Sequence, residues 1–331
     1  MTSEPLTSKP AAGVAQVIDD NVADIGDYQA NSLWRLTLRR VFRQRSAQVG
    51  AVIVSFLILV AIFAPVIAPY DPTTVLIGKE DVRKREAPCI HLLGCPTDRP
   101  QHLLGIDGNV RDQFSRIVYG TRVSLVIGLL VVAIAATIGT VLGAVSAYAG
   151  GWTDNVIMRI LDVVLAFPVL LLAISIMFVF EERSLTQAMI AIAIVSIPAY
   201  ARIVRSAVLT LRETDYVEAS RALGASNLRI LFGRILPNAL PPLIVLATLG
   251  IATAILDTAA LSFLGLGAQE PTAEWGTMLG RERNQLFSAP HLVFAPGIAI
   301  SVTVLAFNLL GDGLRDALDP RLVHGGGVAK E

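Results

Sequence analysis

YVEASRALGASNLRILFGRILPNALPP, residues 216–242, is rich in helix-forming residues and lies between two apolar runs of membrane length. It also carries three arginines: Arg221, Arg229 and Arg234. A simple connector would need neither this length nor a helical pattern. The stretch therefore predicts polar helices at a membrane surface, between two spans.

The same region contains start and stop signals for two helices. Asp215 and Glu218 form a D-x-x-E pattern, which favours capping of the helix that follows. Gly224 supplies the flexible backbone of a turn, Ser226 can cap a second helix, and Leu236-Pro237 interrupts it. A helix in this position could dock into a groove on a soluble partner and carry force into the flanking spans.

The composition points to a membrane protein without a nucleotide site of its own. Of 331 residues, 53% are hydrophobic and 16% charged, and the mean hydropathy is +0.61; soluble domains are about a quarter charged. The net charge is zero, which gives no basic field for nucleic acid. No GxxxxGK[ST] loop is present; GTMLGRERN at 276–284 has the wrong spacing and lacks the lysine.

Six apolar segments reach the length of about 20 residues that a helix needs to cross the hydrocarbon core. They are 47–68, 122–148, 155–180, 186–209, 239–264 and 291–312. The predicted fold class is therefore an all-α integral membrane protein with six transmembrane helices. The loop at 69–121 and the 216–238 segment then lie on opposite sides of the membrane.

The orientation follows from arginines that precede the first span without an acid among them: Arg35, Arg39, Arg40, Arg43 and Arg45. By the positive-inside rule they place the N-terminus in the cytoplasm, and six crossings return the C-terminus there. Residues 1–30 are predicted to be a disordered cytoplasmic tail and 314–331 a second one. Residues 31–46 are either an amphipathic interfacial helix or the cytoplasmic extension of the first span.

Several side chains within the spans stand out. Small residues recur at every fourth position of the second span, which would let helices approach closely: Ala135, Gly139, Gly143 and Ala147. Asp162 and Asp257 are intramembrane carboxylates, each costing roughly 2.5–3.5 kcal/mol at mid-membrane, so they should face protein or water. For Asp162 we favour a structural pair with Arg159 or with an arginine of another span. For Asp257 a pathway role and a structural role both stay open.

The 69–121 loop contains both cysteines of the chain, Cys89 and Cys95. In an oxidising compartment they could close a short loop as a disulfide. Metal capture with His91 and His102 is the alternative, although no standard zinc spacing is present. The loop is a candidate contact for a substrate-delivery protein, and a passive lid is the plainer reading.

Glu218-Ala219-Ser220, Gly224 and Leu236-Pro237 resemble the EAA loop of ABC importer permeases, with Ser220 in place of the second alanine and Arg234 in an isoleucine position. Four further stretches resemble permeases of the dipeptide/oligopeptide/nickel group, closest to its "C" type: 102–125, 158–174, 261–267 and 308–322. The resemblance covers about 34–322. It departs from the family at Ile106-Asp107 and Val110-Arg111-Asp112, where Thr-Asp and Gly-Arg-Asp are usual.

The resemblance implies a type I ABC importer permease fold, with a permease core over 122–313 and a cytoplasmic coupling helix at 215–236. It implies a non-catalytic transport subunit in a bacterial or archaeal cell membrane. Its partners would be a homologous second permease, one or two ABC ATPase subunits that bind ATP and Mg, an extracytoplasmic binding protein and a peptide substrate. No cofactor would bind this chain.

Other functions remain as alternatives. Within the family the substrate could instead be a nickel chelate, glutathione or an oligosaccharide. A self-sufficient secondary transporter or channel would need repeated halves or charged mid-span residues, and no clear internal repeat is present. A membrane-embedded protease is disfavoured because the spans contain no HExxH and no matching pair of catalytic aspartates.

Overall fold

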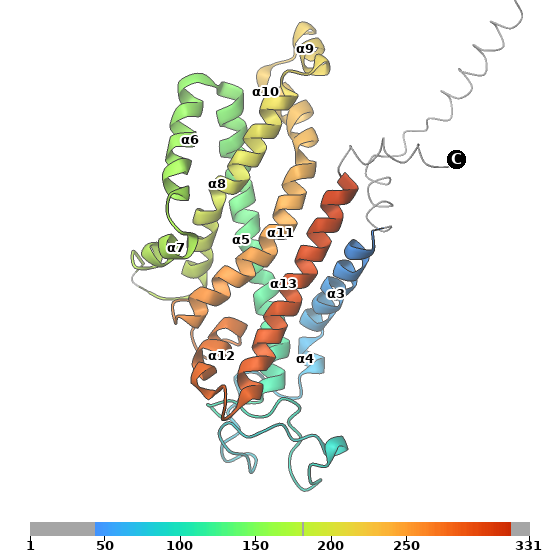
Figure 1. Ribbon diagram of the computed structural model, residues 1–331, viewed down its shortest axis with the longest axis vertical. Coiled ribbons are helices and arrows are strands. Elements are labelled where there is room, and N and C mark those ends of the chain that lie inside the picture. The colour runs from blue at the N-terminus through green and yellow to red at the C-terminus, as the bar shows by residue number, and fades with distance from the viewer. Residues whose placement is uncertain (1–43, 181, 319–331) are drawn as a thin grey trace, which may run out of the picture.

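The computed structural model describes residues 44–180 and 182–318, and this part of the chain is a helical bundle (Figure 1). The long helices are α3 (Arg45–Ile62), α5 (Gln113–Ala149), α8 (Leu185–Leu211), α11 (Leu236–Phe263) and α13 (Pro290–Leu318). Shorter helices are α4 (Ala64–Ile67), α6 (Gly151–Leu165), α7 (Val169–Met177), α9 (Asp215–Ala222), α10 (Asn227–Ile230) and α12 (Trp275–Glu282). The predicted tail at 1–30, the amphipathic helix except for its last residues, and the end of the chain from 319 lie outside the described residues.

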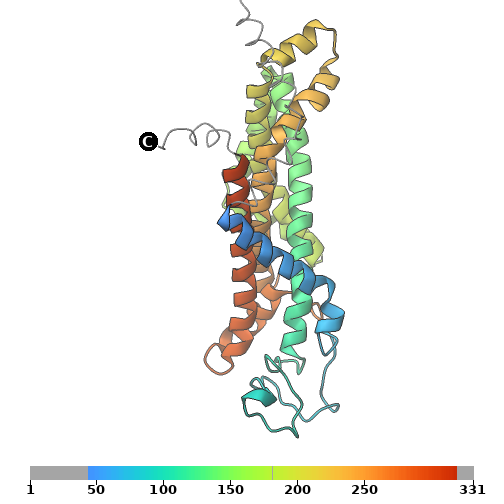
Figure 2. The same cartoon turned by 90° about the vertical axis from the view of Figure 1, so that its right-hand side faces the viewer.

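The helices are arranged as an elongated bundle with two unlike ends. α9 and α10 protrude at one end, and the 68–112 loop with α12 lies at the other (Figure 1). α5 packs against α8, and α13 packs against both α3 and α11. α3 crosses α13 obliquely (Figure 2).

Within residues 44–180 and 182–318, five helical segments are long and apolar enough to cross a membrane: α3, α5, α8, α13 and the continuous helix Asn227–Phe263 that ends in α11. The predicted third span, 155–180, is not one helix. α6 and α7 are bent by 93° relative to each other, so they form either a broken sixth span or a re-entrant pair. Pro168 occupies the N-cap position of α7, where its ψ of 131° is extended. Proline has no N–H to donate to a helix, and it disfavours a helical conformation of the residue before it.

The small-residue ladder of α5 faces α8. A Cβ on Gly139 would lie 2.6 Å from Cβ of Tyr200, and one on Gly143 would lie 2.3 Å from the carbonyl oxygen of Ala201. Ala135 and Ala147 are fully buried. The two backbones therefore approach as closely as the helix-packing interpretation requires.

Two helix starts were not predicted. α5 begins at Gln113 rather than near residue 122, because the Asp112 carboxylate accepts hydrogen bonds from the backbone N–H and hydroxyl of Ser115 at 2.7 and 2.6 Å. α12 follows Glu274, whose carboxylate accepts from the N–H groups of Gly276 and Thr277. These extra turns lie at the loop end of the bundle and position the groups described below.

Candidate functional site

The protruding segment, residues 215–235, is called the elbow from here on. α9 ends in a Schellman turn: Gly224 has φ +79°, its N–H donates to Arg221 O at 3.0 Å, and Ala225 N–H donates to Ser220 O at 3.1 Å. A side chain at Gly224 would be strained by the positive φ, although nothing lies within 4 Å of its Cβ direction. The turn reverses the chain at the tip of the elbow.

The predicted caps of the elbow helices are wrong in detail. Thr214, not Asp215, is the N-cap of α9, and no side chain caps the helix; Thr214 O accepts from Val217 and Glu218 N–H instead. Asp215 is therefore already inside the first helical turn. Ser226 does occupy the N-cap position of α10, but its side chain makes no capping hydrogen bond.

Leu236-Pro237 does not end the second helix. α10 passes through a π-helical segment, Leu231–Ile235, directly into α11, where the proline stands in the first turn. Proline has no N–H for the helix, and the wider π turn before it lets the chain continue rather than stop. The elbow is therefore joined to α11 without a break.

The elbow has one buried and one exposed face. Buried apolar residues of the elbow pack against the ends of α5 and α8. The elbow contributes Val217, Ile230, Leu231 and Ile235. Their partners are Ala144 and Ala147 of α5 and Val204 and Val208 of α8. Leu223, Leu228 and Phe232 are 89%, 70% and 63% exposed, and Glu218 and Ala219 are exposed beside them. Exposed apolar side chains that are rimmed by polar residues are typical of a surface that binds a protein or a membrane. A force on the exposed face would pass to three helices at once.

Ion pairs join the helices near the elbow. Arg205 of α8 donates two 2.6 Å hydrogen bonds to Asp154 of α6, which also accepts from Ser146 of α5. One step further along, Arg202 donates to Asp162 at 2.6 Å. This contact agrees with the expectation that Asp162 pairs with an arginine of another helix. Asp154 was missed, since it lies in the polar first turn of α6.

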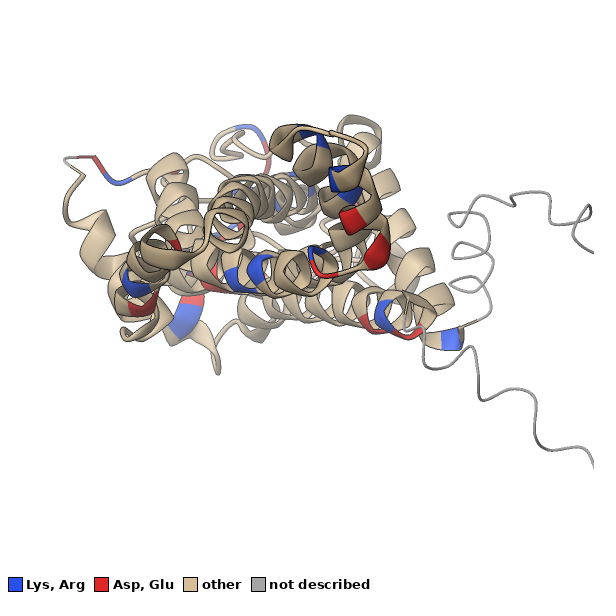
Figure 3. Ribbon diagram, turned by 90° about the horizontal axis from the view of Figure 1, so that it is seen from above, with Lys and Arg blue, Asp and Glu red and all other residues tan. Residues whose placement is uncertain are grey.

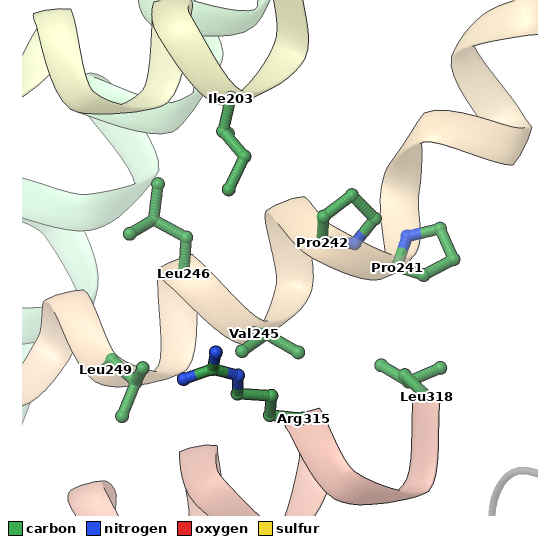
Figure 4. Close-up of a pocket in the computed structure, with 8 residues that line it drawn as sticks. All are labelled: Ile203, Pro241, Pro242, Val245, Leu246, Leu249, Arg315 and Leu318. Atoms are coloured by element: carbon green, nitrogen blue, oxygen red, sulfur yellow. The ribbon is translucent and has the colours of Figure 1, made fainter. Parts of the chain in front are cut away.

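Asp312, Arg315 and Asp316 lie at the end of α13. None of them forms an ion pair within the described residues. Arg315 instead extends over α11 beside Val245 and Leu249 (Figure 4). It lines a groove of about 470 Å³ between α8, α11 and α13 whose other walls are apolar. We call this the elbow-end groove.

A buried ionic cluster holds the loop end together. Arg111 and Arg116 are 4% and 1% exposed. Arg111 pairs with Asp107 at 2.8 Å and also with Glu270, which in turn pairs with Arg281 at 3.0 Å. Burial alone would raise the pKa of Glu270, but the neighbouring arginines outweigh it and hold that pKa below its usual value. The cluster fastens the 68–112 loop and the start of α5 to the segment after α11.

Val110 takes part in the turn that positions this cluster. Asp107 Oδ1 accepts from the N–H groups of Asn109 at 2.9 Å and Arg111 at 2.8 Å, which closes the turn. Val110 adopts φ +59° and is 2% exposed. The family resemblance has glycine at this position, and the structure supplies the reason, because this conformation favours glycine.

His102 lies between two carboxylates in the same loop. Its Nδ1 is 2.8 Å from Asp112 Oδ1, its Nε2 is 3.1 Å from Glu80 Oε2, and Tyr70 stacks on its ring. Desolvation lowers the pKa of His102, but Asp112 and Glu80 raise it by more, so the net shift is upward. Burial, together with Glu80, raises the pKa of Tyr70 to about 12.

Cys89 and Cys95 are joined by a disulfide, with 5.4 Å between their Cα atoms. His91 Nε2 lies 2.8 Å from the carbonyl oxygen of Arg99, and His102 is engaged as described. No group of three or more metal-ligating side chains occurs in residues 44–180 and 182–318. The structure thus pairs the cysteines with each other rather than with the histidines.

Comparison with solved structures defines the class of protein. A chain of the structure titled "Inward facing conformations of the MetNI methionine ABC transporter" (CY5 native crystal form) matches with a TM-score of 0.51 over 62% of this chain and 97% of that chain. The two are 21% identical in sequence, so the match concerns the fold. The chain has the fold of an ABC transporter permease.

Sequence comparison gives the family. Residues 139–324 match the binding-protein-dependent transport system inner membrane component family, and 32–88 match the N-terminal TM domain of oligopeptide transport permease C. The chain is 46% identical to the dipeptide transport system permease protein DppC of Alkalihalophilus pseudofirmus, covering 89% of this chain and 92% of the relative. It is 43% identical to the glutathione transport system permease protein GsiD of Pectobacterium atrosepticum, covering 90% and 94%. The chain belongs to the binding-protein-dependent transport system inner membrane component family.

The family makes the chain a multi-pass, non-catalytic permease subunit of an ABC importer. It also implies ATPase subunits as partners in the complex.

Proposed function

We propose that this chain forms half of a translocation pathway for dipeptides or glutathione. Relatives named for dipeptides and for glutathione are similar to it to almost the same degree, 46% and 43% to 45%. Overall identity therefore does not separate the two cargoes. Oligopeptides, nickel chelates and oligosaccharides are the remaining candidates.

The elbow is the coupling element of the proposed function. The observation that supports this most directly is its asymmetry: an exposed apolar tip on a base that packs with α5 and α8 and continues into α11. Glu218, Ala219 and Ser220 present the docking surface, Gly224 forms its turn, and Leu236-Pro237 joins it to α11. ATP binding would move the docked elbow and, with it, the three helices, which is a conformational equilibrium shifted by a ligand on another subunit.

The proposed orientation places the elbow and both termini in the cytoplasm and the 68–112 loop outside. A homologous second permease completes the pathway, and an extracytoplasmic binding protein delivers cargo to the outer face. The proposed boundaries keep the permease core at 122–313 and the coupling segment at 215–236. The arginines before α3 support this orientation through the positive-inside rule.

The test is reconstitution of the complete complex and measurement of ATP hydrolysis together with cargo uptake. Gly224→Val should leave hydrolysis by the complex while lowering uptake at least tenfold, because a β-branched residue is strained at φ +79° and the exposed turn can relieve that strain by changing shape. Gly151→Val is the matched control: Gly151 has φ +54° and open space around it but lies outside the elbow. Normal uptake by Gly224→Val would contradict the coupling role, and uptake without any ATPase subunit would favour a secondary transporter.

A further inference from the structure

One face of α11 is only partly covered along the length of the helix. Residues on this face recur every three or four positions, and none is buried by the rest of the described chain: Leu246, Leu249, Thr253, Asp257, Ala260 and Leu264. The flanking positions Ala254, Ile255, Ala259 and Leu261 are buried against neighbouring helices. We call this partly covered set the open face of α11.

The open face runs between two hollows of the molecule. At one end Leu246 and Leu249 line the elbow-end groove (Figure 4). At the other end Leu264 lines a hollow of about 320 Å³, together with Gln269, Glu270 and Arg281. A continuous helical face therefore links an opening near the elbow to an opening near the 68–112 loop.

Asp257 is the only ionisable side chain of α11 and lies on this face between the two hollows. Its carboxylate has no hydrogen bond or ion pair with any other residue in 44–180 or 182–318. Asp162 differs, since Arg202 compensates its charge at 2.6 Å. A carboxylate within a span must face protein or water and requires a cationic or hydrogen-bonding partner. The described chain supplies none for Asp257.

We propose that Asp257 binds the primary ammonium group of the cargo as the cargo moves along the open face of α11. This rests on the proposed function, since dipeptides and glutathione each carry a free α-ammonium group, which is primary in all but prolyl dipeptides. The neighbours of Asp257 on the face are leucine, threonine and alanine, which contact a passing side chain without selecting its charge. Arg315, in the groove at the elbow end, offers the opposite charge to a cargo carboxylate as it leaves.

The first experiment asks whether the open face is wetted and negative in the assembled transporter. Cysteine is placed at Ala260, one turn from Asp257, and its reaction with a cationic and an anionic methanethiosulfonate reagent is timed. The buried Ala254→Cys, 3% exposed in the wild type, is the matched control and should not react. A carboxylate about 6 Å away in water favours the cation over the anion by about tenfold, and Asp257→Asn should remove that preference.

The second experiment measures uptake of Ala-Ala by the complete complex. Asp257→Asn should lower uptake at least tenfold with the second permease still bound, and Asp257→Glu should retain most of it. Addition of Ala-Ala should slow labelling of Ala260→Cys only while Asp257 is present. This protection separates cargo binding from a merely structural carboxylate.

Three outcomes would overturn the proposal: an unreactive Ala260→Cys, unchanged uptake by Asp257→Asn, or a charge preference that Asp257→Asn does not alter. Loss of the second permease from the Asp257→Asn complex on purification would also overturn it, since it would mean that a cation of that subunit pairs with Asp257. A wild-type complex that imports neither dipeptides nor glutathione, yet shows the charge preference, would refute the proposed function and leave a cation site on α11 standing.

Discussion

Val110 is a β-branched residue in a backbone conformation that favours glycine, with φ +59°. Its side chain is buried with Leu76 and Ile106, so packing opposes the change that would relieve the strain. At an ordinary helical site, Val→Gly should be about 2 kcal/mol worse than Val→Ala, from one lost methyl and the helix cost of glycine. At Val110 the relief of about 1–3 kcal/mol of strain should cancel that difference.

We therefore expect the free energies of unfolding of Val110→Gly and Val110→Ala to agree within about 1 kcal/mol. The matched pair is Val118→Gly and Val118→Ala, at a site in α5 that is 4% exposed. Denaturant titration of the purified chain measures all four. A gap of the same size at both sites would show that Val110 is not strained.

His102 makes the 68–112 loop sensitive to pH. The pKa of His102 is raised in the fold, so its contribution to stability is present below the unfolded value of about 6.5 and is lost as pH rises through the folded pKa. Amide exchange in residues 69–112, corrected for the intrinsic pH effect, should be slowest at acidic pH and accelerate above neutrality. His102→Gln should exchange faster at acidic pH and lose this dependence; an unchanged profile would refute the assignment.

At the scale of elements, hydropathy predicted the helices whose apolar length matches the membrane. The structure has α8 at Leu185–Leu211 where 186–209 was predicted, because the apolar run and the helix coincide. α5 starts nine residues before its predicted span, since its first turns are polar and lie beyond the apolar run. The eight-residue α12 is too short to register as a span, and the bend at Pro168 falls inside an unbroken apolar stretch.

The residues of the candidate site likewise divide into those that local sequence predicts and those that it does not. The elbow was predictable because its turn and helix signals are local, as at Gly224. Asp154 and Arg205 lie 51 positions apart, and the partners of Arg111 include Glu270, 159 positions away. No local pattern encodes such pairs. They depend on how helices and loops that are far apart in the sequence are placed side by side.

The contact of α5 with α8 gives a prediction for a whole element. Gly143→Val should destabilise the chain by about 1–3 kcal/mol, since the added side chain meets backbone atoms of Ala201 and overpacks the interface. Gly233→Val is the control, because nothing lies within 4 Å of a Cβ at that position. Denaturant titration in detergent should separate the two variants. Equal stability would mean that α5 and α8 are not held at this distance.

At the scale of the whole molecule, the two ends of the bundle are fastened by separate sets of charges. The buried cluster around Arg111 holds the loop end, and the Asp154–Arg205 pair holds the elbow end. Figure 3 shows charged residues gathered at several separate places around the bundle when it is viewed along its long axis. α5 connects the two sets, from Asp112 at its start to Ser146 near its end, about 50 Å apart at 1.5 Å per residue.

Because the sets share no residue and lie so far apart, their contributions to the stability of the isolated chain should be additive. Arg111→Ala removes the nearest cation from two carboxylates, Asp107 and Glu270, and leaves them only their contacts with Arg116 and Arg281, so it should cost up to about 5 kcal/mol. Asp154→Asn should cost less, since Arg205 is one-third exposed and can reach water. Amide exchange should rise at the loop end only in the first variant and at the elbow end only in the second.

The double variant tests whether α5 transmits strain between the ends. Its loss of stability should equal the sum of the single losses within about 0.5 kcal/mol. Arg281→Ala is a milder variant of the loop-end cluster, because Arg281 is half exposed, and it keeps the cycle measurable if Arg111→Ala does not fold. An interaction energy above about 1 kcal/mol would mean that the ends act as one unit even without the ATPase. Additive losses would instead mean that the two ends are not coupled in the isolated chain. Coupling between them would then require the assembled transporter, in which the elbow is docked on the ATPase.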